Sequence, residues 1–484
     1  MTMQVVIVGR DTALWLTAAA LRQALAPAGV AVTAVELPSR LSPASVHAAL
    51  PALEALHAKL GLDEAAVLGA TRGSFTLGFN IAPPGGGAPF FLAHGAYGAP
   101  IEGGDFFPYW LKARRFGLDA ALEDFSATAM AARHGRMMLP DAETEAFGRT
   151  DYGYHLPAIA YAAMLKRLAL RLGVTMRQAV TIAVERDPIQ GSICGVRSDG
   201  GDPITGDLFI DASGAEAVLI GDAPGVGCED WRSYFPLDRR LVAQAPRFAS
   251  LPVYAEVRAD ARSWTALHAA QDATHVVHCY TGNEESDEAA LAAAARRAGL
   301  PLDGAVATPT APARRLDGWS GNCVAIGAAA CAFDPLFEVD LHAVQLGIVH
   351  LLSLFPVGED AAAERAEYNR ITTSLFERIR DFQAAFYALA MASQAPKTLA
   401  HRIAAFRARG IIAPMEDDSF PVDQWRALFT GLGLPAESWP PAIDDTPPEA
   451  IKQGLRRILG FVKRKVLEQP THDAYLADLG GKAA

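Results

Sequence analysis

Cysteine is scarce in this sequence and is not arranged as it is in disulfide-rich or zinc-binding proteins. The 484 residues include 5 cysteines, and no two of them form a C-x-x-C pair. An odd number of scattered cysteines argues against a disulfide framework and against a thiolate zinc site. We therefore expect a protein of the reducing cytoplasm that binds no metal. The cysteines are Cys194, Cys228, Cys279, Cys323 and Cys331.

Long basic runs and long apolar runs are also missing. The formal net charge is -11 at pH 7 and no basic run offsets it, so we expect no nucleic-acid partner. No apolar run reaches the roughly 18 residues of a transmembrane helix. Met1 leads directly into a strand-like segment at residues 4–8, without the cationic and apolar regions of a signal peptide. We expect neither a membrane span nor a targeting segment.

What the sequence does have is a globular composition and a β-α-β pattern at its start. Hydrophobic residues make up 51% of the chain and charged residues 20%, which is typical of a compact fold with a large core. An apolar run at 5–8 leads to Gly9, to an alanine-rich stretch at 12–25, and to a second strand at 30–35 that ends at Glu36. A dinucleotide would bind at the first turn of such a unit.

The rest of the chain mixes helices with two kinds of strand. Buried strands are expected at 208–214 and 324–327, whereas the alternating segments within 231–308 are typical of an antiparallel sheet. The tail past Pro396 is helical and ends in a basic amphipathic segment at 451–466. Further helices are expected at 46–60, 154–172, 341–355 and 360–392.

Several motifs, in the right order, resemble those of the flavin-dependent tryptophan halogenases. The first βα turn, Gly9–Trp15, reads GRDTALW where that family has roughly GGGTAGW, and Leu208–Gly214 reads LFIDASG where the family has LFIDCSG. The other matches are Tyr154–Ala158 with Leu165–Ala169, Phe235–Arg239, Gly321–Gly327 with Phe333–Leu336, and Glu377–Tyr387. Together these motifs span roughly residues 4–435.

The resemblance implies an α/β protein with a Rossmann-like FAD/NAD(P)-binding fold of the flavoprotein monooxygenase type. An interleaved antiparallel-sheet substrate domain and a helical C-terminal region would complete it. We expect the discontinuous FAD-binding domain at 1–70, 150–225 and 309–358, the substrate-covering domain at 71–149 and 226–308, and the helical region at 359–484.

The resemblance also implies a site for FAD. Glu36 stands at the end of the second strand, where a carboxylate accepts hydrogen bonds from a ribose diol; otherwise it is only a solvated strand-end carboxylate. The remaining residues that would hold FAD are Gly9, Thr12, Ala13, Val180, Gly214, Gly327, Asp334, Pro335, Asp340 and Leu341.

The phosphate-binding turn departs from the family pattern. Two glycines of G-x-G-x-x-G are replaced by Asp11 and Leu14. The second glycine normally lets the backbone approach the pyrophosphate, and the third lets the helix pack on the strand. Asp11 instead places a carboxylate near the expected phosphates. FAD binding is therefore either retained in weakened form or lost, and both readings stay open.

The catalytic signatures depart further. In the family, reduced flavin and oxygen convert halide to hypohalous acid, which reaches a lysine beside the substrate; Thr76 occupies that lysine position, and a threonine cannot replace an ammonium there. Phe337–Asp340 replace the glutamate and halide loop, and two carboxylates there would repel chloride. Glu338 is either a displaced acid or a solvated or structural carboxylate. Only Trp264 remains of the W-x-W-x-I-P signature.

We therefore predict a FAD-dependent oxidoreductase related to the halogenases, a monooxygenase acting on an aromatic or amino-acid substrate, with Thr76 and Glu338 facing the substrate. The alternative is a flavin-free pseudoenzyme that acts as a binding or partner protein. A true tryptophan halogenase ranks third. By family analogy, a separate flavin reductase and a homodimer are expected.

Three other groups of residues have mainly structural interpretations. His275 and His278 point to opposite faces of one strand, so they are not expected to share a metal. Phe106, Phe107 and Trp110 either clasp an aromatic substrate or pack in the core. The basic residues Lys452, Arg456, Lys463, Arg464 and Lys465 are expected on a solvated helix face, with contact to a partner or an anionic surface as the alternative.

Overall fold

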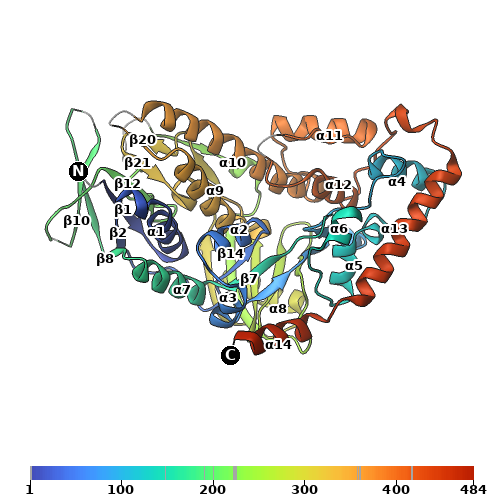
Figure 1. Cartoon of the computed structure of the whole chain (residues 1–484), viewed down its shortest axis with the longest axis horizontal. Helices are drawn as coiled ribbons and strands as arrows, with labels where there is room; N and C mark the ends of the chain where they lie inside the picture. Colours follow the sequence, from blue (N-terminus) through green and yellow to red (C-terminus); the bar gives the residue numbers. More distant parts are fainter. Residues whose placement is uncertain are drawn as a thin grey trace. The chain divides into compact units, whose positions relative to one another are not determined.

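The structure is a computed structural model that describes residues 3–147, 149–189, 191–199, 201–221, 226–356, 358, 361–415 and 418–483. Its elements are shown in Figure 1. The chain divides into two compact units, each built from three segments. The first unit comprises Met1–Arg72, Leu156–Arg232 and Pro309–Arg380; the second comprises Gly73–His155, Ser233–Thr308 and Asp381–Ala484.

A six-stranded sheet is the centre of the first unit, in the order β20-β21-β12-β1-β2-β8. The strands from β21 to β8 run parallel, and only β20 is antiparallel to its neighbour. A parallel sheet is covered on both faces, so its strands read as continuous apolar runs. The strands are β1 (Gln4–Gly9), β2 (Ala31–Glu36), β8 (Thr175–Gln178), β12 (Leu208–Ala212), β20 (Trp319–Ser320) and β21 (Cys323–Ala325).

The helix α1 (Asp11–Leu25) joins β1 to β2 and completes the predicted β-α-β unit. It packs against α7 (Ala158–Arg171) and α9 (Asp340–Ser353). Its residues from Leu14 to Leu21 are buried, which explains why this stretch is rich in alanine: small side chains let a helix lie close to its neighbours. The first unit also contains α2 (Ala52–Lys59), α3 (Glu64–Thr71) and the smaller strands β9 (Ile182–Arg186), β10 (Ile193–Ser198) and β11 (Ile204–Thr205).

Two predicted helices begin later than expected. Residues 46–49 form the strand β3 (Val46–Ala49), and only α2 beyond it is helical. Likewise β7 (Gly153–Pro157) precedes α7, so Tyr154 and His155 are in a strand. Both predictions of a helix from the first residue were wrong because strand pairing outweighs local propensity: β7 pairs with β4 (Ser74–Thr76), which is distant in sequence.

The second unit is built on a seven-stranded sheet in the order β18-β14-β17-β16-β15-β5-β6. Most neighbours are antiparallel, as the alternating pattern predicted, and β15 and β5 are parallel. The helix α8 (Asp287–Ala298) covers one face, where Leu241, Ala243 and Tyr280 pack with Ala290. The strands are β5 (Gly78–Ala82), β6 (Phe90–Ala93), β14 (Arg239–Pro246), β15 (Ala255–Ala259), β16 (Trp264–Ala269), β17 (Ala273–Tyr280) and β18 (Asp303–Pro309).

The chain ends in a series of helices. These are α10 (Ala362–Ala390), α11 (Lys397–Arg409), α12 (Val422–Gly431), α13 (Pro448–Glu468) and α14 (His472–Ala483). The second unit also holds α4 (Phe106–Arg115) and α5 (Ala127–Arg133), which contact α13. The predicted fold class, a Rossmann-like α/β protein with an antiparallel second sheet and a helical C-terminal region, is confirmed.

One described segment, Leu336–Ser353, is long and apolar enough to cross a membrane by length and composition. Since 67% of it is buried inside the protein, it equally meets the description of a core helix. Within the described residues, no group of three or more His, Cys, Asp or Glu side chains could hold a metal ion.

Candidate functional site

The candidate cofactor site lies at the carboxyl edge of the parallel sheet. The strands β12, β1 and β2 are neighbours and run in the same direction, so the loops that follow them meet at one edge. Ligands of open parallel sheets bind in this crevice. All eleven predicted cofactor-binding residues belong to the first unit, which contains this edge.

Gly9 ends β1 at a point of close backbone approach. A Cβ atom on this residue would lie 2.5 Å from the carbonyl oxygen of Ala212 on β12. The backbone N–H of Arg10 donates to that same oxygen at 3.3 Å, and the N–H of Leu37 donates to the carbonyl oxygen of Gly9 at 2.8 Å. Gly9 is therefore required for strand packing, whatever its part in binding a phosphate.

Charged side chains from three loops meet beside the start of α1. Arg10 follows β1, Arg40 follows β2, and Glu216 follows β12. Arg10 Nη2 lies 3.1 Å from Glu216 Oε2, and Arg40 forms an ion pair with the same carboxylate. Asp11 has a left-handed φ of 55°, and its carboxylate accepts a bond from the backbone N–H of Arg40 at 3.1 Å. The predicted Asp11 carboxylate is thus one member of a mixed charge cluster.

The next two predicted positions on α1 are in contact with other elements. Thr12 Oγ1 lies 2.9 Å from His47 Nε2. The Ala13 Cβ lies 3.8 Å from where a Cβ on Gly327 would be. Gly327 has a left-handed φ of 64° and Gly214 one of 91°, so both loops turn sharply at the glycines that the sequence singled out.

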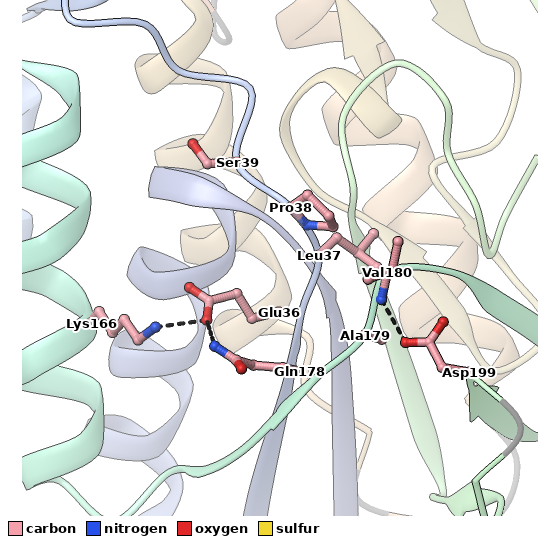
Figure 2. Close-up of a pocket in the computed structure, with 9 residues that line it drawn as sticks. All are labelled: Glu36, Leu37, Pro38, Ser39, Lys166, Gln178, Ala179, Val180 and Asp199. Carbon is pink, nitrogen blue, oxygen red and sulfur yellow. Dashed lines mark hydrogen bonds and ion pairs between the residues drawn. The ribbon is translucent and has the colours of Figure 1, made fainter.

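Glu36 borders a pocket of about 470 Å³ at the end of β2. Figure 2 shows its side chain between those of Lys166 and Gln178, with Leu37 beside Val180. The pocket is lined by Glu36–Ser39, Lys166, Gln178–Val180 and Asp199. Lys166 Nζ donates to Glu36 Oε2 at 2.6 Å and Gln178 Nε2 donates to the same oxygen at 3.4 Å. Trp15 Nε1 donates to Glu36 Oε1 at 3.3 Å. Both carboxylate oxygens are therefore held, and the side chain is more than a free solvated group.

Val180 forms the opposite border of this pocket and is 72% exposed. Its backbone N–H donates to Asp199 Oδ2 at 2.7 Å (Figure 2), and the N–H of Thr181 donates to Oδ1 at 3.0 Å. These backbone bonds, the first of them from Val180, lower the pKa of Asp199. The carboxylate therefore stays charged and fixes the loop between β8 and β9.

Asp211 anchors the loop after β12. It is fully buried, and its carboxylate accepts bonds from Ser213 Oγ at 2.6 Å and from the backbone N–H groups of Leu219 and Ile220 at 2.7 and 2.9 Å. A buried carboxylate is stable only when it is bonded in this way. Asp211 thereby holds both ends of the segment that carries Glu216.

The predicted residues before and at the start of α9 form a tight turn. Asp334 Oδ1 accepts a bond from the N–H of Leu336 at 2.9 Å, and Pro335 caps the short helix that follows. Phe337 and Glu338 both have left-handed φ angles, 66° and 48°. Glu338 is 6% exposed, which rules out a solvated carboxylate and leaves a structural carboxylate and a displaced acid as its two interpretations. Asp340 is the first residue of α9, and Leu341 after it is buried.

Thr76 lies on β4 in the second unit, whereas Glu338 belongs to the first. Thr76 is 1% exposed. Its hydroxyl donates to the carbonyl oxygen of Gly78 at 3.1 Å and accepts from the N–H of Gly78 at 3.4 Å. On β16, Trp264 Nε1 donates to the Tyr387 hydroxyl at 2.7 Å. The Thr76 bonds are thus to the main chain of Gly78, and Trp264 bonds a second aromatic side chain.

The second unit also contains buried histidines that the sequence analysis did not single out. His155 and His268 meet edge to face with ring centroids 5.1 Å apart. Burial lowers the pKa of His94 and of His155 to about 3, and it lowers the pKa of His268 as well.

The two histidines that the sequence analysis considered lie on opposite faces of β17. His275 is opposite His268 across β16 and β17, while His278 is on the other face of β17. Among the described residues, neither His275 nor His278 belongs to a group of three or more His, Cys, Asp or Glu side chains that could hold a metal ion.

The remaining candidates pack inside the second unit. Phe107 stacks on Trp110 at 5.6 Å and Phe106 meets Phe125 at 5.1 Å, and all four rings are buried, which favours core packing. On α13, Lys465 is 6% exposed and bonds Asp141, so the prediction of a solvated basic face was wrong for this residue. Lys452 and Lys463 are exposed, as predicted.

Sequence reasoning missed Lys166, Arg40, Glu216 and Asp211. Asp211 carried a signal, because an acidic residue inside a buried apolar strand must have partners. Lys166 lies inside the matched motif Leu165–Ala169, but nothing in that motif marked its side chain, and Arg40 carried no signal at all.

Comparison with known proteins gives consistent matches. The family model described as tryptophan halogenase matches residues 4–448. Among solved structures, BrvH, a flavin-dependent halogenase from Brevundimonas sp. BAL3, is 30% identical with a TM-score of 0.93, covering 99% of both chains. Xcc4156, a flavin-dependent halogenase from Xanthomonas campestris, is 28% identical with a TM-score of 0.93, covering 99% of this chain and 98% of that one. Tryptophan 6-halogenase SttH from Streptomyces toxytricini is 23% identical over 386 residues, 75% of this chain and 71% of SttH.

Proposed function

The chain belongs to the tryptophan halogenase family, and from that premise we propose that it is a FAD-dependent oxidoreductase that oxygenates an aromatic or amino-acid substrate. The observation that carries the proposal is the Glu36 carboxylate, held by Lys166 and Trp15 at the end of β2 beside a pocket. This is the position from which an acidic side chain binds a ribose diol.

The residues of the first unit fit FAD. The pocket beside Glu36 has a volume of about 470 Å³, which is within the roughly 300–1,000 Å³ of ligand pockets. Its walls offer two carboxylates, an ammonium group, an amide and main-chain groups. Beside α1, the two arginines balance the two carboxylates. Besides Glu36, FAD would be held by Gly9, Thr12, Ala13, Val180, Gly214, Gly327, Asp334, Pro335, Asp340 and Leu341.

When bound, FAD in its reduced form supplies electrons for the activation of oxygen. The chain's own residues would orient it: Lys166 and Trp15 keep Glu36 in position, and Glu36 would accept bonds from the ribose hydroxyls. Thr76 would face the substrate as a neutral hydroxyl that already bonds Gly78. Because it has no ammonium group, Thr76 cannot hold or polarise an electrophilic halogen species as a lysine does. Glu338 is proposed to face the substrate as a buried carboxylate.

The proposed reaction requires partners. A separate flavin reductase would deliver the reduced flavin, and the substrate would be an aromatic compound or an amino acid. Assembly as a homodimer, by analogy with the family, is part of the same proposal. So is a cytoplasmic location, which the cysteine usage favours.

A second candidate is a flavin-free protein of the same fold that binds a partner. The Asp11 carboxylate at the start of α1 favours it, because a negative charge beside the expected diphosphate weakens dinucleotide binding.

The test is a titration of the purified protein with FAD and, without oxygen, with reduced FAD, followed by fluorescence and calorimetry. We expect binding in the micromolar range or tighter, and we expect Glu36→Gln to weaken it by roughly tenfold because hydrogen bonds to a charged acceptor are lost. Glu54→Gln, on the exposed side of α2, is the matched control. If neither FAD nor reduced FAD binds, flavin chemistry is eliminated.

If flavin binds, product analysis distinguishes oxygenation from halogenation. Reduced flavin, oxygen and candidate aromatic substrates are incubated with and without bromide. Oxygenated product or peroxide that is independent of bromide is expected, whereas a brominated product would contradict the interpretation of Thr76 and Asp340.

A further inference from the structure

The Glu216 carboxylate lies between two arginines at the edge where the cofactor site is expected. Arg10 Nη2 is 3.1 Å from Glu216 Oε2, and Arg40 Nη2 pairs with Glu216 Oε1. Each carboxylate oxygen therefore has its own guanidinium group. The three residues come from three different loops, which follow the adjacent parallel strands β12, β1 and β2, so the sheet itself brings them together.

The two arginines differ in how firmly they are placed. The Arg10 side chain is 11% exposed, and its Nε is buried without a hydrogen-bond partner in the described part of the chain. The Arg40 side chain is 63% exposed, but its backbone is tied to Asp11 at 3.1 Å. Arg10 is thus a largely buried cation with one unused donor, and Arg40 is an exposed cation whose backbone is held by Asp11. Such a pair suits an anion with several oxygens.

Glu216 is the exchangeable member of this cluster. Its side chain is 41% exposed, and it is at the tip of a loop whose ends are fixed by Asp211. The residue after it, Ala217, has a left-handed φ of 47°. The side chain can therefore turn outward without disturbing β12.

We propose that Arg10 and Arg40 are the diphosphate-binding residues of this chain, and that Glu216 is an internal anion that occupies them until a dinucleotide displaces it. The inference rests on the proposed function for the identity of the ligand as FAD, while the anion chemistry itself requires only a diphosphate. It explains how a turn without its second and third glycines still binds a dinucleotide: arginine side chains replace backbone N–H groups as donors.

Displacement has two consequences. Binding exchanges one anion for another, so the affinity for a diphosphate is lower than two free arginines would give. Ligands with a diphosphate compete with Glu216, whereas ligands without one gain nothing from its removal. The substitution Glu216→Gln keeps the shape of the side chain and removes its charge.

The experiment is calorimetric titration of the full chain with ADP and FAD, and with riboflavin as the ligand that lacks phosphate. Glu216→Gln is expected to bind ADP and FAD roughly tenfold tighter than the parent protein, because a competing charge near the surface is removed. Riboflavin binding is expected to change by less than about twofold. Arg10→Met, with Glu216 unchanged, is expected to bind ADP at least roughly tenfold more weakly than the parent.

The matched control is Glu367→Gln, which removes an exposed carboxylate that is paired with Arg370 on α10. It changes net charge by the same amount and is expected to leave ADP affinity within about twofold. Thermal melting and circular dichroism of each variant establish that it is folded, and Glu216→Ala serves as a second variant at the same position.

The outcomes separate this inference from the proposed function. Equal ADP affinity in Glu216→Gln, Glu216→Ala and Glu367→Gln overturns the inference, even if FAD binds the parent protein. Tighter ADP binding in the Glu216 variants without any FAD binding supports the arginine pair but eliminates flavin chemistry. No ADP binding by any folded variant overturns the inference as well.

Discussion

Gly9 illustrates how one residue connects the sheet to the candidate site. It ends β1, and a Cβ atom there would lie 2.5 Å from the Ala212 oxygen and 2.7 Å from the Ala212 Cβ. Both contacts are with the neighbouring strand β12, which cannot move without separating the sheet. The glycine is therefore needed before any cofactor is considered.

We expect Gly9→Ala to lower the free energy of unfolding by about 1–3 kcal/mol, the usual cost of forcing an extra methyl group into a packed core. Urea denaturation followed by circular dichroism measures this change. Gly69→Ala is the control, since Gly69 lies on α3 with no atom within 4 Å of its Cβ position; there alanine is expected to stabilise by up to about 1 kcal/mol. Equal stabilities of the two variants would show that the approach of Gly9 to Ala212 is not a constraint.

At the scale of single residues, the sequence predicted where a residue lies in the fold better than it predicted which side chains that residue contacts. Glu36 was placed correctly at the end of β2, because a strand that follows a glycine turn and a helix is easily recognised. Its partner Lys166 was not found, since it is 130 residues away and only the packing of α7 beside α1 brings it near. Interactions between distant segments leave no local pattern.

Strands and helices were predicted well where the spacing of apolar residues was clear. They were predicted poorly where a strand ran into a helix without a turn between them. The strand β1 and the helix α1 have distinct periods, with Gly9 between them, and both were found. The strand β7 runs directly into α7 at Pro157, and the apolar side chains on each side gave no sign of the change. A strand that is defined by its partner cannot be recognised from its own residues.

The helix α13 shows how a buried charge docks an amphipathic element. Lys465 Nζ lies 2.5 Å from Asp141 Oδ2 and 3.3 Å from Glu143 Oε2, and its side chain is 8% exposed. The hydrogen bond with Asp141 raises the pKa of Lys465 and lowers that of Asp141, so both groups are charged at neutral pH.

We expect Lys465→Met to destabilise the protein by about 1 kcal/mol or more, since two carboxylates lose their cation. Lys463→Met, on the exposed side of the same helix, should have no measurable effect. Urea denaturation at pH 7 of both variants, of Asp141→Asn and of the double variant gives the coupling between Lys465 and Asp141. A coupling of zero would mean that the helix docks by its apolar side chains alone.

For the whole molecule, the resemblance found in the sequence covered nearly the same span as the family match, roughly residues 4–435 against 4–448. Ordered motifs specify a fold because each fixes one strand or turn and their sequence order fixes the connections. They do not specify the chemistry of a site, for which Thr76, Asp11 and Glu338 were expected from the sequence to depart from the family pattern. At those residues, the chemistry depends on the charges and contacts of this chain's own side chains.

Buried histidines are expected to make the protein less stable in mild acid. Burial lowers the pKa of each of them below the ordinary 6.5, to about 3 or 4 where a value is resolved. They are His57, His94, His155, His268, His278, His342 and His472. In the unfolded chain these side chains take up protons near pH 6.5. The unfolded state therefore binds more protons between pH 6.5 and about 4.

Because the pKa values of these histidines are depressed in the folded protein, the stability that they contribute is fully present above pH 6.5. That contribution is lost as the pH falls toward 4. Each neutral buried histidine contributes a slope of roughly 1.4 kcal/mol per pH unit in this window. Urea denaturation at pH 7, 6 and 5 measures how the free energy of unfolding changes with pH. His94→Gln removes one titrating group and should reduce that slope by the contribution of about one proton. Stability that is unchanged from pH 7 to pH 5 would contradict the burial of these seven side chains.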